Sequence, residues 1–129
     1  MPIAFSVDHE KQVVSTIASG PITFDEIREH VHRERDQGGI AYREFIDATQ
    51  ASAAFTSAQA RTVVEIVRSL ARKGDFGPTA VLVANDVTYG MIRMLQILLE
   101  DVADIGVYRA HERQAAETWV LNYPRGPGR

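Results

Sequence analysis

Cysteine is absent from the 129 residues, and the chain has neither a basic excess nor a long apolar run. Without cysteine it forms no disulfide and offers no thiolate nucleophile and no cysteine-based zinc or iron–sulfur site. Lysine and arginine number 14 against 17 acidic residues, so the formal charge is −3, which is not the basic footprint of a nucleic-acid-binding protein. No run approaches the ~20 apolar residues that span a bilayer.

The N-terminus also lacks the marks of a secretory leader. Its residues, MPIAFSVDHEKQ, contain neither a basic stretch nor a long apolar core. We therefore expect a cytoplasmic protein, with peripheral contact to a membrane surface left open. The size and the 45% hydrophobic content suit one globular domain, expected over residues 1–121. Residues 122–129, which contain proline and glycine, are expected to form a flexible tail.

Hydrophobic periodicity and helix-end signals predict the element order β-β-α-β-α-β-α-β-α. The expected strands cover residues 3–8, 13–18, 42–48, 79–84 and 106–110, and the expected helices cover residues 24–37, 57–73, 87–102 and 112–121. Gly20-Pro21 is expected to end the second strand, and residues 50–55 to form a loop. The alternation favours an α/β domain whose mixed sheet starts with an antiparallel hairpin and continues with parallel strands.

Two of the expected helices begin with capping-box spacing, Thr23 with Glu26 and Thr56 with Gln59. The helix after Thr23 has a thin apolar face. We therefore expect it to be peripheral, with Glu34 on its polar surface.

The apolar stretch 79–100, TAVLVANDVTYGMIRMLQILLE, is expected to organise the core. Its strand lacks alternation, which is typical of a strand covered on both faces. The helix that follows has a primary apolar stripe formed by Val87, Met91, Met94, Leu95, Leu98 and Val102. Ile92, Ile97 and Leu99 add more apolar surface than one packed face needs. A second contact is expected, either a homodimer interface or a groove for an apolar ligand.

Catalytic, metal and cofactor motifs do not stand out. His30 and His32 are two positions apart on a helix and point about 200° away from each other, so they do not share a metal. No metal and no cofactor are expected. Neither a G-x-S-x-G elbow nor a glycine-rich phosphate loop is present. Asp47 and Asp86 are both expected at C-terminal strand ends, where open α/β sheets bind ligands. They form either the acid/base pair of a hydrolase-type enzyme or, more commonly, a turn former and a helix N-cap.

Polar and soft apolar side chains meet on the main helix. Tyr89 and Arg93 are one turn apart and are candidates to contact a polar ligand or to form the rim of a subunit contact. Met91 and Ile92 supply apolar surface of the kind found both in cores and at adaptable binding sites.

Two segments carry a resemblance to a known family. Phe45-Ile46-Asp47 ends a strand in aspartate, and residues 84–94, ANDVTYGMIRM, open a helix after an Asn-Asp pair. With these segments and the opening hairpin, the chain resembles the SpoIIAA-like proteins over about residues 3–120. These are small bacterial domains of the STAS type (sulfate transporter and anti-sigma-factor antagonist).

The resemblance implies a SpoIIAA-like sheet with its helices packed on one side and no enzymatic role. One branch of the family is phosphorylated just after the strand that ends in aspartate, which places the phosphoacceptor at Thr49. The Gly-Leu-Gly that follows in that branch is absent here. The other branch is associated with apolar ligands or membrane surfaces.

Together these observations predict a cytoplasmic, non-enzymatic domain that binds a small apolar ligand, a membrane surface or a protein partner. The expected binding site consists of Asp47, Asn85, Asp86, Tyr89, Met91, Ile92 and Arg93. A homodimer is expected, and nucleic acid is not. The alternatives are a partner-switching protein phosphorylated on Thr49 and a hydrolase-type enzyme that uses Asp47 and Asp86.

Overall fold

The computed structural model describes residues 2–124. Its strands are β1 (Ile3–Asp8), β2 (Val13–Ile22), β3 (Arg43–Ala53), β4 (Thr79–Val83) and β5 (Ile105–Arg109). Its helices are α1 (Phe24–Asp36), α2 (Ser57–Ala71), α3 (Asp86–Leu98) and α4 (Arg113–Asn122), the last preceded by a 3₁₀ turn, η1 (Ala110–Glu112). The element order and the fold class are those predicted from the sequence.

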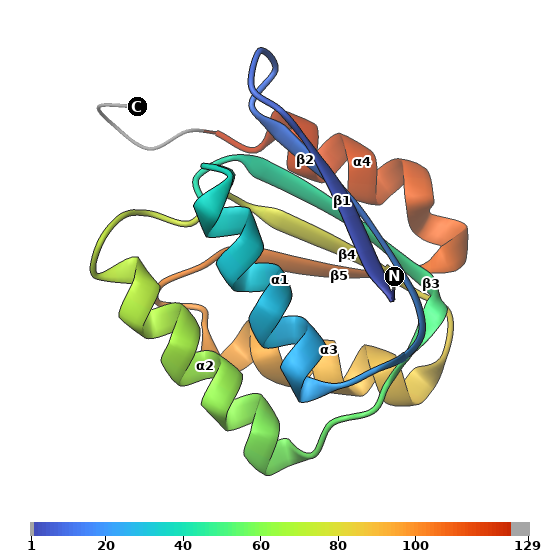
Figure 1. Ribbon diagram of the computed structural model, residues 1–129. Helices are drawn as coiled ribbons and strands as arrows, with labels where there is room; N and C mark the ends of the chain where they lie inside the picture. The colour runs from blue at the N-terminus through green and yellow to red at the C-terminus, as the bar shows by residue number, and fades with distance from the viewer. Residues whose placement is uncertain (1, 125–129) are drawn as a thin grey trace.

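The strands form one mixed sheet in the order β1-β2-β3-β4-β5. β1 and β2 form the predicted antiparallel hairpin. β2, β3, β4 and β5 are parallel to their neighbours. Because each parallel strand is added next to the preceding one, right-handed crossovers place the three connecting helices on the same face of the sheet. α1, α2 and α3 do lie together on one face (Figure 1).

The final helix departs from the prediction that the helices pack on one side. α4 lies across the opposite face of the sheet (Figure 1), where Ala116 and Val120 pack against Ala80 and Leu82 of β4. α4 follows the last strand, so no crossover constrains its side. The alternate residues of β4, Val81 and Val83, are buried under the other helices. β4 is therefore covered on both faces, as its unbroken apolar run predicted.

Both capping boxes are confirmed, but two strands run further than predicted. The side chains of Thr23 and Thr56 accept hydrogen bonds from the backbone N–H groups of Glu26 and Gln59. β2 continues through Gly20, whose φ of +71° is accessible to glycine, and ends at Ile22. Residues 19–22 of β2 pair with residues 50–53, so this part of the expected loop is strand.

The apolar surface of α3 is divided differently from the predicted stripe. Val87, placed in the primary stripe, is 72% exposed, whereas Ile92, placed outside it, faces the interior. Met91 and Met94 pack against the cluster that includes the apolar face of α2. α3 therefore contacts α2 as well as the sheet, and the predicted homodimer interface stays a prediction.

No helix within residues 2–124 is long and apolar enough to cross a membrane. The flexible tail predicted for residues 122–129 lies mostly outside the described part of the chain. Where it is described, the Tyr123 ring lies edge-on to Trp119 with centroids 5.1 Å apart. The Tyr123 carbonyl accepts a hydrogen bond from Arg43 Nη1 at 2.6 Å.

Candidate functional site

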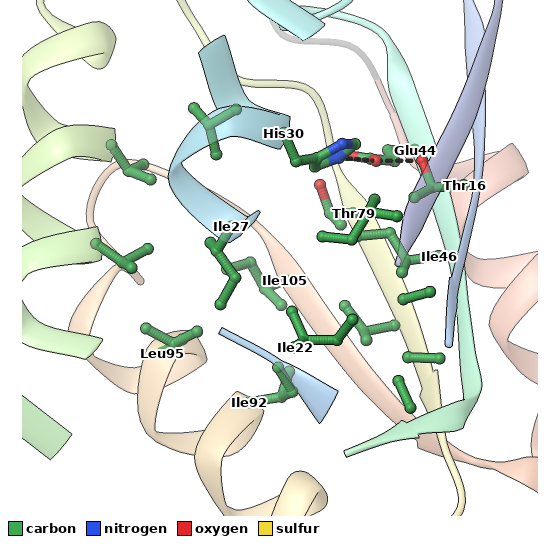
Figure 2. A pocket seen from close by; sticks show the side chains of 18 of the residues that line it. Thr16, Ile22, Ile27, His30, Glu44, Ile46, Thr79, Ile92, Leu95 and Ile105 are labelled. Carbon is green, nitrogen blue, oxygen red and sulfur yellow. Dashed lines mark hydrogen bonds and ion pairs between the residues drawn. The ribbon is translucent and has the colours of Figure 1, made fainter. Parts of the chain in front are cut away.

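A cavity of about 200 Å³ lies between the sheet and the three helices α1, α2 and α3. Its walls are almost entirely apolar, and branched side chains from several elements surround it in Figure 2. The labelled apolar residues of the wall are Ile22, Ile27, Ile46, Ile92, Leu95 and Ile105. Native interiors contain few voids larger than a water molecule, so an apolar space of this size is an exception to ordinary core packing.

Small side chains on the sheet create this space. Ala18 of β2 and Ala48 and Ala51 of β3 are buried on the cavity face. Opposite them, Ile27 of α1 and Ile92 of α3 pack against the same cluster. Each of these three alanines has only one side-chain carbon. The larger side chains around them set the distance between the sheet and the helices, so the space between the two layers is incompletely filled.

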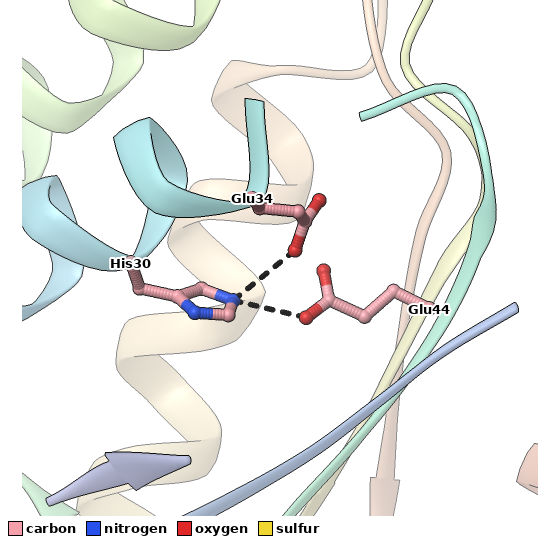
Figure 3. Close-up of side chains that lie close together, drawn as sticks. All are labelled: His30, Glu34 and Glu44. Carbon is pink, nitrogen blue, oxygen red and sulfur yellow. Dashed lines mark hydrogen bonds and ion pairs between the residues drawn. The ribbon is translucent and has the colours of Figure 1, made fainter. Parts of the chain in front are cut away.

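One end of the cavity is polar. His30 and Glu34 are one turn apart on α1, and Glu44 projects toward them from the start of β3 (Figure 3). His30 Nε2 lies 3.0 Å from Glu44 Oε2 and 3.2 Å from Glu34 Oε2. Thr16 Oγ1 of β2 donates a hydrogen bond to Glu44 Oε2 at 2.6 Å. We call His30, Glu34 and Glu44 the buried triad.

Burial and mutual charge shift the protonation of the buried triad. Burial lowers the pKa of His30, but its close interactions with the carboxylates of Glu34 and Glu44 outweigh it and raise that pKa to about 10. Burial and the nearby charge of Glu44 raise the pKa of Glu34 to about 8. Burial acts upward on Glu44 as well, but its interactions with His30 lower its pKa below the usual value. At neutral pH the triad therefore holds a protonated imidazole, an ionised Glu44 and a protonated Glu34.

The sequence contained a signal for this triad that the histidine spacing obscured. His30 and Glu34 lie three and seven positions after Ile27, an inward residue of α1, so helical periodicity places them on the inner face. The partner of His30 on α1 is Glu34, one turn along the helix, and not His32. The predicted surface position of Glu34 is wrong: this residue is 5% exposed. Glu44 shares its strand face with Ile46 and is equally buried.

Asp47 of the predicted site and the candidate phosphoacceptor Thr49 lie in the middle of β3, not at its C-terminal end as predicted for Asp47, because the strand continues to Ala53. Thr49 Oγ1 and Thr49 N–H both donate hydrogen bonds to Asp47 Oδ1. Asp47 Oδ2 accepts from Arg113 of α4 at 2.5 Å, so its side chain is on the α4 face of the sheet. Burial raises the pKa of Asp47, but the bonds from Arg113 and Thr49 outweigh it and hold that pKa below its usual value. A lowered pKa does not suit a general acid.

Phosphorylation of Thr49 stays a prediction. The residue belongs to β3 rather than to a loop, and its hydroxyl is 2.7 Å from a carboxylate oxygen of Asp47. A phosphoryl group added there meets like charge.

Asp86 and Tyr89 of the predicted site both contact the side chain of Arg109. Arg109 of β5 forms an ion pair with Asp86 at 2.6 Å and lies over the Tyr89 ring at 4.3 Å. Arg93 instead donates a hydrogen bond to Gln96 on the helix surface. Of the seven predicted binding residues, Ile92 is the one that lines the cavity. The polar end of the cavity lies at the N-terminal ends of the parallel strands, opposite the predicted position.

Asn85 has a structural role as the N-cap of α3. Its Oδ1 accepts a hydrogen bond from Thr88 N–H at 2.8 Å. Replacing a capping side chain with alanine costs about 1 kcal/mol. We expect Asn85→Ala to lower the free energy of unfolding by that amount in urea denaturation, and Asn85→Asp, which keeps the acceptor, to lose less. Equal losses for the two variants would contradict the capping role.

The fold matches solved structures, whereas no protein-family model and no curated protein matches the chain. An uncharacterized protein from the DUF3478 family with a SpoIIAA-like fold, from Shewanella loihica PV-4, aligns over 92% of this chain and 93% of its own. The TM-score is 0.58 and the sequence identity 12%. The anti-sigma factor antagonist SpoIIAA in its unphosphorylated form aligns over 89% of this chain and 96% of its own, at a TM-score of 0.49 and 18% identity. The first match confirms the SpoIIAA-like fold predicted from the sequence.

Proposed function

We propose that the protein is a non-catalytic binding domain that takes a small apolar ligand into the cavity beneath α1, α2 and α3. The observation that carries this proposal is the cavity itself, about 200 Å³ with apolar walls. An engineered apolar cavity of ~150 Å³ stays dry and binds benzene, so a space of this size suits a single ring with a few further atoms. Sites for drug-sized ligands begin at roughly 300 Å³, so a long-chain lipid exceeds this cavity.

The buried triad adds one polar requirement for the ligand. Glu34 Oε2 is buried and ion-paired with His30, but it makes no hydrogen bond within the described part of the chain. A hydroxyl or amine on the ligand satisfies this oxygen, whereas the apolar walls reject further polar groups, because each unpaired one costs free energy on burial. We therefore propose a mostly apolar ligand that carries one hydrogen-bonding group at one end.

Binding of toluene, indole and 4-methylphenol tests the proposal. We expect at least one of them to raise the melting temperature saturably and to shift backbone amide NMR signals, most strongly at cavity residues, because ligand binding to the folded state alone stabilises it. Ala48→Leu, which fills the cavity, should abolish this response. Ala115→Leu, the same change on the exposed face of α4, should preserve it.

The proposal fails if none of the three probes binds, or if Ala48→Leu binds them as well as the unmodified protein does. A response lost equally in Ala115→Leu would also contradict it, because that residue lies on the opposite face of the sheet from the cavity.

A further inference from the structure

Three donor atoms of the buried triad converge on one point, and all lie within 4.8 Å of one another. The side chains of His30, Glu34 and Glu44 are 10%, 7% and 6% exposed. Exposed carboxylates often gather without function, but these two are enclosed with an imidazole between them. Burying ionised groups costs several kcal/mol each, and a buried ion pair repays this cost poorly compared with apolar packing. Stability alone is therefore a weak reason for the triad.

We propose that His30, Glu34 and Glu44 bind one divalent first-row transition-metal cation. The donor set, one imidazole nitrogen and two carboxylate oxygens, is of the kind that Zn²⁺, Mn²⁺ and Fe²⁺ accept. Binding of a divalent cation displaces the two protons that His30 and Glu34 hold in the metal-free chain at neutral pH. The resulting neutral imidazole and two ionised carboxylates carry a charge of −2, which the cation neutralises. This site goes beyond the apolar ligand proposed above and does not depend on it.

The distances fit a shared cation. His30 Nε2 is 3.0 Å from one carboxylate oxygen and 3.2 Å from the other. Metal–ligand bonds of about 2.1 Å place neighbouring donors roughly 3.0–3.4 Å apart, and the two nitrogen–oxygen distances already meet this spacing. The two carboxylate oxygens lie within 4.8 Å of each other. Figure 3 shows both carboxylates directed at the same ring nitrogen.

One carboxylate oxygen of the triad lacks a hydrogen bond. His30 Nε2 lies within hydrogen-bonding distance of Glu44 Oε2, at 3.0 Å. Glu34 Oε2 is buried, lies 3.2 Å from His30 Nε2 in an ion pair, and accepts no hydrogen bond from the described residues. Such an unsatisfied oxygen costs about 1–3 kcal/mol, and a cation bound to all three donors removes the cost.

Two surrounding features also suit a metal site. Thr16 donates a hydrogen bond to Glu44 Oε2, the type of outer contact that orients a ligating carboxylate. All three residues of the triad line the cavity, and Figure 2 shows His30 and Glu44 at its wall. A cation held by these three protein ligands would therefore have coordination positions open toward the cavity. Water or the polar group of a bound molecule can occupy these positions.

A Co²⁺ titration of the untagged, chelator-treated full chain tests the site. We expect visible d–d absorption that saturates at one Co²⁺ per chain and is displaced by Zn²⁺. Glu34→Gln, which keeps the shape of the side chain, should weaken Co²⁺ binding at least about 10-fold, because it replaces a charged ligand. Glu29→Gln, the same change on the exposed side of α1, should leave binding unchanged.

Glu44→Gln and the proton NMR spectrum of the Co²⁺ complex provide a second readout should Glu34→Gln not fold. The complex should show paramagnetically shifted signals from one imidazole, and His30→Gln should remove them. Absence of Co²⁺ binding at millimolar concentration, or binding that survives changes at Glu34 and Glu44, would overturn the proposal. Neither result bears on toluene binding, so the two proposals fail independently.

Discussion

Raising the pH from about 6 to about 9 is expected to lower the free energy of unfolding of the metal-free protein by about 2 kcal/mol or more. The cause is the buried triad. His30 has a pKa of about 10 in the folded chain against an ordinary 6.5, and Glu34 about 8 against 4.5. Each unit of such a difference is worth about 1.4 kcal/mol.

The sign of this pH dependence follows from whether the folded or the unfolded chain holds more protons. Both pKa values are raised by folding, so above pH 4.5 for Glu34 and above pH 6.5 for His30 the folded chain keeps protons that the unfolded chain releases. The stabilisation is complete below these ordinary values and disappears as the pH rises through about 8 and then about 10. Glu44 has a lowered pKa and acts in the opposite direction, since its contribution is lost as the pH falls below its ordinary 4.5.

Urea denaturation at a series of pH values measures this slope. Glu34→Gln should flatten the profile, because glutamine does not titrate, while the exposed Glu29→Gln should retain it. A profile that is flat between pH 6 and 9 would show that the triad does not hold its protons in the folded state. Measurements below pH 9 avoid the general titration of lysine and tyrosine.

Two alanine-to-leucine changes on opposite faces of the sheet are expected to differ by at least about 2 kcal/mol. Ala48 of β3 faces the cavity, and Ala80 of β4 faces α4 and is fully buried. Leucine at Ala80 has no space to enter, and overpacking a filled core costs about 1–3 kcal/mol. Leucine at Ala48 enters the empty volume, where each added carbon gains up to about 0.8 kcal/mol.

Each variant controls for the other, because both changes add the same atoms to a buried strand position. Chemical denaturation should show Ala80→Leu clearly destabilised and Ala48→Leu equal to or more stable than the unmodified chain. Similar losses for the two would mean that the cavity face is packed as tightly as the α4 face, which would remove the basis for a ligand there.

Local signals accounted for most of the element pattern. Thr23 and Thr56 start helices through hydrogen bonds to residues three positions later, and such contacts need no tertiary partner. Strand ends were predicted less well, since residues 19–22 and 50–53 are strand because they pair with each other. The side taken by α4 also lay beyond local reasoning, because no crossover constrains a helix that follows the last strand.

The candidate site, too, was only partly predictable from the sequence. The inward direction of His30 and Glu34 follows from helical periodicity, so two of the three residues of the triad could be read from the sequence. Their approach to Glu44 depends on how α1 lies over β3, and the cavity depends on which alanines face the helices. Side-chain type and local periodicity are properties of the sequence. The convergence of the triad and the empty volume of the cavity arise only when the helices pack on the sheet, so the tertiary structure alone decided them.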